Sequence, residues 1–184
     1  MKRRALFLDR DGVVNIDKGY VYRKKDIEFV DGIFDLVRLA KSLDYLVIVV
    51  TNQAGIGRGY YSTEQFWSLM EWISERFCRY GGALDGTYFC PDHPIYGVGE
   101  YKRASLCRKP APGMLLSAIR DWDIDEGKSI LIGDKISDIQ AGNTAGVGVN
   151  LLFNLQGEEN YQPVIHHLSQ AKVFLSSSAF IVPA

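Results

Sequence analysis

Short apolar segments alternate with amphipathic segments along most of this chain. Six short runs of aliphatic, β-branched or aromatic residues have the length and composition of strands. They are residues 5–8, 45–50, 87–90, 129–132, 146–149 and 172–175. Between several of these runs, apolar residues recur every three or four positions, which predicts helices over residues 31–40, 62–77 and 112–122. Alternating strands and helices with short connections predict an α/β fold, in which helices cover both faces of a parallel sheet.

Local signals sharpen two of these elements. Segment 45–50 is apolar without alternation, which is typical of a strand buried on both faces of a parallel sheet. Ser62 and Gln65 form the pattern of a capping box, so a helix is expected to begin next to Ser62. In open parallel sheets, ligands bind beyond the carboxyl ends of the strands, where the strand order reverses. The chemically active residues are therefore expected directly after the strands.

Composition indicates one ordinary globular unit. The chain has 184 residues, of which 47% are hydrophobic and 23% are charged. No Pro-, Gly- or Ser-rich linker divides it, so residues 1–184 are expected to form a single domain with its motifs in a core at about 5–150. The formal net charge of -1 gives no general attraction to nucleic acid or to an anionic membrane, and neither partner is expected. Nothing in the sequence indicates assembly beyond a monomer.

Targeting and membrane signals are not expected. The basic start at residues 2–4 precedes only four apolar or small residues, too few for the core of a signal peptide. The longest apolar run, 45–50, is far shorter than the roughly 20 residues that cross a bilayer. The expected location is the cytoplasm.

Carboxylates follow the first and the fourth predicted strands. Asp9 and Asp11 come directly after residues 5–8, and at alternate positions of an extended segment both carboxylates can face one site. Asp134 and Asp138 follow the fourth strand. Carboxylates this close repel one another unless a cation or a shared proton lies between them. Hard oxygen ligands of this kind suit Mg²⁺, which commonly binds one or two carboxylates together with substrate phosphate and water.

Groups suited to phosphate follow other strands. Thr51, Asn52 and Gln53 come directly after the second strand, and Arg108 and Lys109 precede a proline. Each group alone often has a structural role, such as a turn or a solvated charge. Their joint occurrence at the ends of several strands predicts a single site for a phosphorylated substrate.

Four motifs resemble, in order, the signature motifs of the haloacid dehalogenase superfamily of phosphohydrolases. They are Asp9-x-Asp11-Gly12, Thr51, Lys109 and Gly133-Asp134-x-x-x-Asp138. The resemblance spans residues 5 to about 150 and implies a Rossmann-like, doubly wound, mainly parallel sheet. It implies that Asp9 attacks phosphorus, and that Asp11 first protonates the leaving oxygen and then deprotonates water. By the same resemblance, Thr51 and Lys109 hold the phosphoryl oxygens, while Asp9, the backbone carbonyl of Asp11, and Asp134 bind Mg²⁺.

Longer segments resemble the heptose bisphosphate phosphatase branch of that superfamily, whose nearest sister group is the histidinol phosphatases. They are residues 7–15, 19–21, 51–59 and 107–114. This resemblance implies a small sugar phosphate as substrate, a heptose 1,7-bisphosphate of a bacterial surface-polysaccharide pathway that loses its 7-phosphate. The residues implied to contact the substrate are Asp17, Lys18, Gly19, Tyr20, Asn52, Gln53, Ala54, Arg58, Arg108 and Lys135. The guanidinium fork of Arg108 suits a second phosphate.

Spacing limits the size of any cap over the site. About forty residues separate Asp11 from Thr51 and include a helix, so a separate cap domain does not fit there and only a minimal cap is expected. An open site with short specificity loops also keeps two other substrates in view, histidinol phosphate and the 3′-phosphate of a polynucleotide. A non-catalytic domain that only binds phosphorylated ligands is the alternative from another class. The presence of every chemical group of the four motifs speaks against it.

The segment 90–107 departs from the family pattern. The family often carries a structural zinc there, held by Cys-x-His and Cys-x-Cys pairs. Here the first pair is Cys90-Pro91-Asp92, with His93 one place late, and the second is Ser105-Leu106-Cys107. A degenerate zinc site from Cys90, Asp92, His93 and Cys107 is conceivable, because zinc usually takes four such ligands. A loop held by packing and hydrogen bonds is the preferred expectation.

Overall fold

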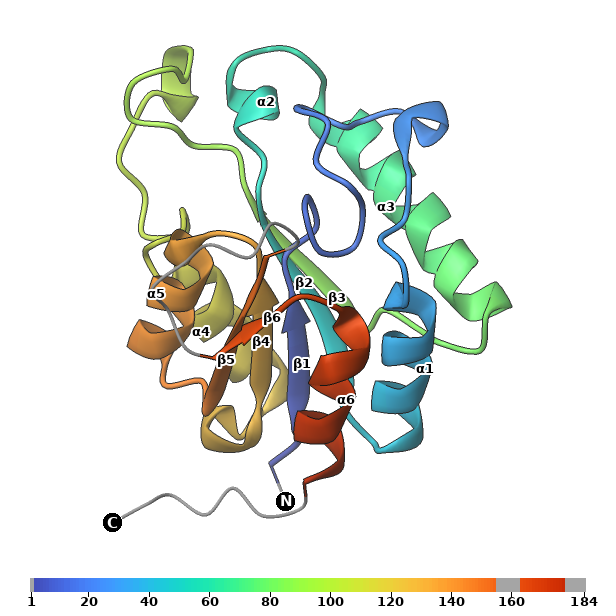
Figure 1. Ribbon diagram of the computed structural model, residues 1–184. Coiled ribbons are helices and arrows are strands. Elements are labelled where there is room, and N and C mark those ends of the chain that lie inside the picture. The colour runs from blue at the N-terminus through green and yellow to red at the C-terminus, as the bar shows by residue number, and fades with distance from the viewer. Residues whose placement is uncertain (1, 155–162, 178–184) are drawn as a thin grey trace.

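A computed structural model describes residues 2–154 and 163–177 of the chain (Figure 1). Its centre is a six-stranded sheet in which every neighbouring pair of strands is parallel. In spatial order the strands are β3 (Gly86–Cys90), β2 (Leu46–Asn52), β1 (Ala5–Leu8), β4 (Ile130–Gly133), β5 (Val149–Phe153) and β6 (Val164–Ile165). The order reverses between β1 and β4, which confirms the doubly wound, Rossmann-like sheet. The single domain over 1–184 stays a prediction, because parts of that range lie outside the described residues.

Helices cover both faces of the sheet (Figure 1). On one face lie α1 (Ile33–Ser42), α3 (Thr63–Arg79) and α6 (Leu168–Ser176). On the other lie α4 (Gly113–Trp122) and α5 (Ile136–Ala145). Side chains of β1 alternate between the two cores, with Leu6 and Leu8 in the first and Ala5 and Phe7 in the second. Because both faces are covered, the first six residues of β2 are buried, and the first five of them are apolar.

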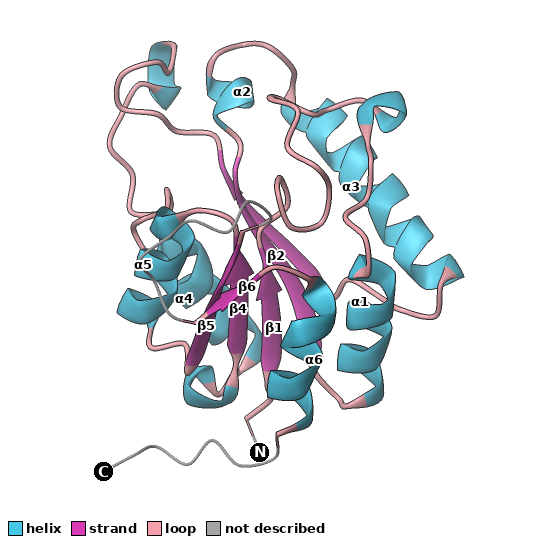
Figure 2. Ribbon diagram, viewed as in Figure 1, coloured by secondary structure: helices cyan, strands magenta, loops and turns pink. Residues whose placement is uncertain are grey.

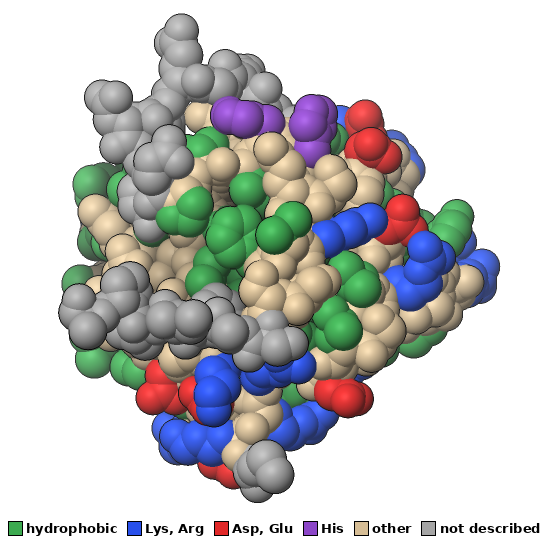
Figure 3. Space-filling view, turned by 60° about the horizontal axis from the view of Figure 1, so that its bottom comes forward, with side chains coloured by type: hydrophobic (Ala, Val, Ile, Leu, Met, Phe, Trp, Pro, Cys, Tyr) green, Lys and Arg blue, Asp and Glu red, His purple; other side chains and the backbone are tan. Residues whose placement is uncertain are grey.

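The sheet has two different ends. At the carboxyl ends of the strands, the described parts of the long loops carry short helices, among them α2 (Ala54–Gly57) and the 3-10 turns Lys24–Asp26 and Gly99–Tyr101 (Figure 2). This arrangement confirms the minimal cap. At the amino ends, Lys and Arg side chains are interspersed with Asp and Glu on the surface (Figure 3). A third 3-10 turn, Glu126–Lys128, precedes β4 there.

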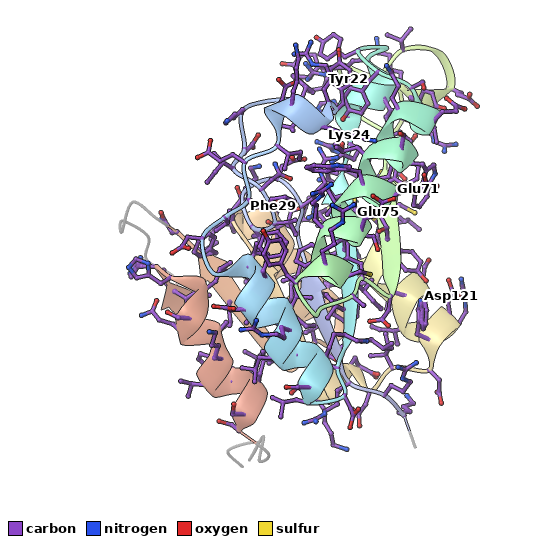
Figure 4. All side chains as sticks on the ribbon, turned by 90° about the vertical axis from the view of Figure 1, so that its right-hand side faces the viewer. Tyr22, Lys24, Phe29, Glu71, Glu75 and Asp121 are labelled. Carbon is purple, nitrogen blue, oxygen red and sulfur yellow. The ribbon has the colours of Figure 1, made fainter. Side chains whose placement is uncertain are left out.

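The long loop after β1 is tied to the helices beside it. The ring of Phe29 lies 4.7 Å from that of Phe34 in α1 and 6.0 Å from that of Trp72 in α3 (Figure 4). The capping box at the start of α3 is confirmed, since the Ser62 hydroxyl accepts a bond from the Gln65 backbone N–H and the Gln65 side-chain oxygen accepts one from the Ser62 backbone N–H. These contacts hold the loop against the helices α1 and α3.

Two strand predictions were displaced or wrong. Residues 146–148 form a turn and β5 begins only at Val149, because Gly146 ends α5 in the left-handed region at φ 81°. Residues 172–175 belong to α6 and not to a strand. Leu168, Ala171 and Leu175 are the buried positions of that helix, a three-four spacing that a segment of only four residues does not reveal.

Among the described residues, no helix combines the length and the apolar character needed to cross a membrane.

Candidate active site

Lys109 lies at the centre of a buried charge cluster beyond β1 and β4. Its Nζ is 2.8 Å from Asp9 Oδ1 and 2.6 Å from Asp138 Oδ1, and it donates to the Val50 carbonyl at 2.9 Å. All three charged side chains are under a tenth exposed. Burial works to lower the pKa of Lys109, but the charges of Asp9 and Asp138 outweigh it and raise that pKa. Lys109 is therefore a fixed cation beside the predicted nucleophile.

Asp134 shares this cluster and supplies the best place for a metal ion. Oxygens of Asp9, Asp134 and Asp138 lie within 4.8 Å of one another. Burial, and then the nearby charge of Asp9, raise the pKa of Asp134 to about 7. Its Oδ1 is buried without a hydrogen-bond partner among the described residues. Two close carboxylates with an unused buried oxygen fit a hard divalent cation such as Mg²⁺.

Gly12 makes room for Asp134 in this cluster. Its φ of +104° is a left-handed value that glycine adopts readily. A Cβ at this position would lie 2.2 Å from Asp134 Oδ2. Gly12 of the first motif thus leaves the space that the Asp134 carboxylate of the fourth motif occupies.

Asp11 is held by donors on several sides. Arg10 is fully buried and donates through Nη2 to Asp11 Oδ1 at 2.9 Å and to Asp11 Oδ2 at 2.8 Å. Asn15 donates to Oδ1 at 3.1 Å, and Gln53 donates to Oδ2 at 2.9 Å. The side chain stays partly exposed at 17% and borders the cavity described below. The carboxylate is therefore oriented by the protein while one side remains open to a ligand.

Thr51 and Asn52 end β2 at the same edge of the sheet. Thr51 is 1% exposed, and its Oγ1 accepts a bond from Gln53 at 2.8 Å. Asn52 exchanges two bonds of 3.1 Å with the backbone of Lys109. The amide of Asn52 thereby fixes the chain that carries Lys109, a role that its position in the sequence did not indicate.

An open cavity of about 640 Å³ lies over these groups. Its lining includes most of the residues predicted to contact a substrate: Asp17, Gly19, Tyr20, Asn52, Gln53, Ala54, Arg108 and Lys135. Two predicted residues are not in the lining. Lys18 pairs with Glu28 at 2.8 Å, and Arg58 lies at the rim between two tyrosine rings. Ser137 and Tyr61 also line the cavity without having been predicted as site residues. Asp138 lines it too, and the fourth motif had named this residue without giving it a role.

One side of the cavity gathers cations. Arg58 lies 5.4 Å from the Tyr20 ring centre and 4.3 Å from that of Tyr96. Burial, and the like charge of Arg58, act to lower the pKa of Arg108. Arg108 donates to the Asp92 carbonyl at 3.2 Å, a bond that leaves its positive charge unneutralised. Two guanidinium groups near each other form a surface suited to an anion.

On the other side, Lys135 lies between two carboxylates. Its Nζ is 3.3 Å from Asp17 Oδ2 and 3.5 Å from Asp134 Oδ2. Burial acts to lower the pKa of Lys135, but the charges of Asp134, Asp9 and Asp17 raise it. Lys135 thus links the loop after β1 to the start of α5.

The geometry of segment 90–107 gives no support for zinc. Asp92 Oδ2 pairs with Arg103 at 3.1 Å, and His93 Nδ1 accepts two backbone N–H bonds at 3.1 and 3.2 Å. Cys90 is buried and Cys107 is exposed. In the described part of the chain, the carboxylate group of Asp9, Asp134 and Asp138 is the set close enough for a shared ion, and it includes no residue of this segment.

Comparison with known proteins identifies relatives of this chain. Residues 106–159 match the family described as HAD-hydrolase-like. The D-glycero-α-D-manno-heptose-1,7-bisphosphate 7-phosphatase of Burkholderia mallei is 60% identical over 83% of this chain and 81% of its own length. The D-glycero-β-D-manno-heptose-1,7-bisphosphate 7-phosphatase of Vibrio cholerae is 45% identical, covering 94% of this chain and all of its own.

Solved structures agree on the fold. A HAD-like phosphatase from Mesorhizobium loti is 31% identical with a TM-score of 0.85, covering 95% of this chain and 86% of its own. A D,D-heptose 1,7-bisphosphate phosphatase from B. bronchiseptica, solved with magnesium and phosphate, is 26% identical with a TM-score of 0.81. That match covers 96% of this chain and 99% of the other. The chain therefore belongs to the haloacid dehalogenase-like phosphatases, a family of phosphoric monoester hydrolases, among the relatives of the heptose bisphosphate phosphatases.

Proposed function

We propose that this protein removes the 7-phosphate of D-glycero-D-manno-heptose 1,7-bisphosphate through a covalent aspartyl-phosphate on Asp9. The observation that carries the proposal is the buried contact of Lys109 with Asp9 and Asp138 beneath an open cavity of about 640 Å³. Lys109 fixes the Asp9 carboxylate and adds positive charge where a transferred phosphoryl group would lie. The substrate is proposed from the names of the relatives.

The first step forms a bond between an Asp9 oxygen and phosphorus and breaks the bond from phosphorus to the sugar oxygen. The leaving oxygen takes a proton from Asp11. In the second step water attacks the same phosphorus, Asp11 takes a proton from that water, and the Asp9 carboxylate returns as inorganic phosphate leaves. Splitting one displacement into two easier ones is the gain of covalent catalysis. A positioned acid and base contribute typically ~10²–10⁴-fold.

Asp9, Asp134 and the backbone carbonyl of Asp11 would hold Mg²⁺, as the donor chemistry of the cluster favours. When bound, this ion would neutralise charge shared by the phosphate and the carboxylates. Thr51 would donate its hydroxyl hydrogen to a phosphoryl oxygen. Lys109 would contact another phosphoryl oxygen from the buried side of the cavity.

Substrate selection would depend on the second phosphate. Arg108 lines the cavity, and Arg58 lies close enough to it for its charge to act on Arg108. Guanidinium groups recognise phosphate well, because they can donate two parallel hydrogen bonds to it. A bisphosphate would place its reacting phosphate at Asp9 and its other phosphate toward these two side chains. Histidinol phosphate lacks the second anion, so this feature favours the sugar bisphosphate.

The direct test measures Mg²⁺-dependent phosphate release from three substrates. They are heptose 1,7-bisphosphate as both anomers, histidinol phosphate and a 3′-phosphorylated oligonucleotide. We expect the highest kcat/KM on the heptose bisphosphate, with the α anomer ahead because the B. mallei relative carries that name. A chelator should abolish the activity and added Mg²⁺ restore it. Preference for the oligonucleotide, or no turnover of any substrate, would refute the proposal.

A further inference from the structure

Gln53 lines the cavity, yet its polar groups are used inside the protein. The side chain is 2% exposed. Its Nε2 donates to Asp11 Oδ2 at 2.9 Å and to Thr51 Oγ1 at 2.8 Å, and its Oε1 accepts from the Tyr61 hydroxyl at 2.6 Å. Both amide hydrogens are therefore occupied, and none remains for a substrate.

The direction of this amide follows from its partners. In the second step of the proposed reaction, Asp11 is an ionised carboxylate before it takes the proton of water, and an ionised carboxylate only accepts hydrogen bonds, so the amide nitrogen of Gln53 faces it. The amide oxygen then faces Tyr61, which must donate. Burial raises the pKa of Tyr61 to about 12, against the opposing charge of Arg10, so the phenol keeps its proton at neutral pH. If the amide were reversed, the Gln53 oxygen would face an oxygen of the Asp11 carboxylate, and neither atom could donate a hydrogen bond.

The same amide determines which way the Thr51 hydroxyl points. A hydroxyl has one hydrogen to donate and two lone pairs to accept with. Since Gln53 occupies an acceptor position of Thr51, the hydroxyl hydrogen is free to point at a phosphoryl oxygen. One side chain thus orients two groups of the proposed reaction.

The position of Tyr61 is itself fixed. The residue is 5% exposed, and its ring stacks on that of Tyr22 with a centre separation of 4.9 Å and an angle of 8° (Tyr22 is labelled in Figure 4). At Gly55, an added Cβ would lie 2.2 Å from Tyr61 Cε1. Gly55 therefore leaves the space that the Tyr61 ring fills.

From this network we infer that Tyr61 is a positioning residue for the reaction. Acting through Gln53, its hydroxyl aims the Asp11 carboxylate at the leaving oxygen and the Thr51 hydroxyl at the phosphate. Gln53 is likewise a positioning residue, and its side chain does not contact substrate. The inference rests on the proposed function only in the roles given to Asp11 and Thr51.

The test compares kcat/KM of Tyr61→Phe on an alkyl and on an aryl phosphate. This ratio reports on all steps up to departure of the leaving group. The sugar alcohol of heptose bisphosphate needs a proton from Asp11 to leave, whereas nitrophenolate from p-nitrophenyl phosphate leaves without one. We expect kcat/KM to fall roughly tenfold on the sugar substrate, as for one lost buried hydrogen bond, and clearly less on the aryl substrate. Equal losses on both substrates would overturn the route through Asp11, and no loss on either substrate would overturn the whole inference.

A double-mutant cycle separates a relay from two independent effects. If Tyr61 acts only through Gln53, adding Tyr61→Phe to Gln53→Met should cause no further loss of kcat/KM. Additive losses would contradict the relay. Tyr45→Phe is the matched control, because Tyr45 is fully buried before β2 at the amino end of the sheet and should leave kcat/KM unchanged. Thermal unfolding of each variant checks that the fold is intact.

The outcome can be told apart from failure of the proposed substrate. If the wild-type protein does not hydrolyse heptose bisphosphate, glycerol 3-phosphate serves as the alkyl probe and the same comparison applies. If Asp9→Asn keeps full activity, the nucleophile is wrong and the roles of Asp11 and Thr51 fall with it. If the wild type is active and Tyr61→Phe has the same kcat/KM as the wild type, only the relay through Tyr61 would be overturned.

Discussion

Charged side chains lie at both ends of the sheet, but their surroundings differ. At the amino end, Lys2 and Glu126 lie 3.8 Å apart with side chains 54% and 39% exposed. At the carboxyl end, Lys109 contacts Asp9 and Asp138 with all three side chains under a tenth exposed. Solvent screens the first pair and is excluded from the second group.

Energetics explain why only one end is reactive. Burying ions costs several kcal/mol each in solvation, and their mutual attraction offsets this only when the geometry is good. At the carboxyl end, oxygens of Asp9, Asp134 and Asp138 lie within 4.8 Å of one another. Burial, and then the charge of Asp9, raise the pKa of Asp134 to about 7. The amino end also has a hollow, of about 380 Å³ beside Arg3 and Arg4, but its charges are solvated or paired. Burial of unbalanced charge, and not charge itself, marks the site.

The largest difference between the ends should be in turnover. Asp9→Asn replaces the carboxylate nucleophile with an amide and is expected to abolish phosphate release, while circular dichroism remains that of the wild type. Lys2→Met at the amino end should keep full activity. Full activity of Asp9→Asn, in a preparation shown to be free of contaminating phosphatase, would end the assignment of the nucleophile.

Stability should show the next largest difference. Lys109→Met leaves two buried carboxylates without their shared cation, so the free energy of unfolding should fall by about 3–5 kcal/mol without Mg²⁺. The same change at Lys2 should cost less than about 1 kcal/mol, because that pair is exposed. Urea unfolding of both variants measures the contrast. Equal losses at the two positions would contradict the distinction drawn between the ends.

Asp134, at the carboxyl end, should determine how the stability of the metal-free protein depends on pH. The folded pKa of Asp134, about 7, lies above its ordinary value of 3.8, so the folded protein binds more protons than the unfolded chain between these values. Stability of the metal-free protein should therefore fall as pH rises from about 4 to 7. Mg²⁺ affinity should rise over the same range, because the carboxylate must lose its proton to bind.

Thermal unfolding across pH in the presence of chelator checks this prediction. Asp134→Asn, which has no titrating group at this position, should show a shallower fall of melting temperature with pH. The same slope in both proteins would assign the effect to other groups.

The smallest expected effect belongs to the amino end. Arg4 donates to the Leu43 carbonyl at 2.9 Å and lies 4.4 Å over the Tyr45 ring. Arg4→Met should reduce the free energy of unfolding by about 1 kcal/mol and leave kcat/KM unchanged. A clear loss of kcat/KM with an intact fold would show that the two ends are coupled.

Local sequence pattern determined the architecture and the main chemical groups. The unbroken apolar run of β2 required burial on both faces, and the helical spacing in α3 required a core beneath it. Because parallel strands align their carboxyl ends at one edge, Asp9 and Asp134 had to lie near each other. Pattern failed at residues 172–175, where three apolar residues after Lys172 fit either a strand or a turn of α6.

Only the tertiary structure decided how these groups are partnered. Lys109 meets Asp9 across 100 positions of sequence, Asn52 turns to the Lys109 backbone, and the Tyr61 hydroxyl reaches Gln53. Loop paths and packing of distant segments set such contacts, and local preferences of the chain do not specify them. The periodic pattern of apolar residues therefore determined where the chemistry lies, and long-range packing decided which side chains hold it in place.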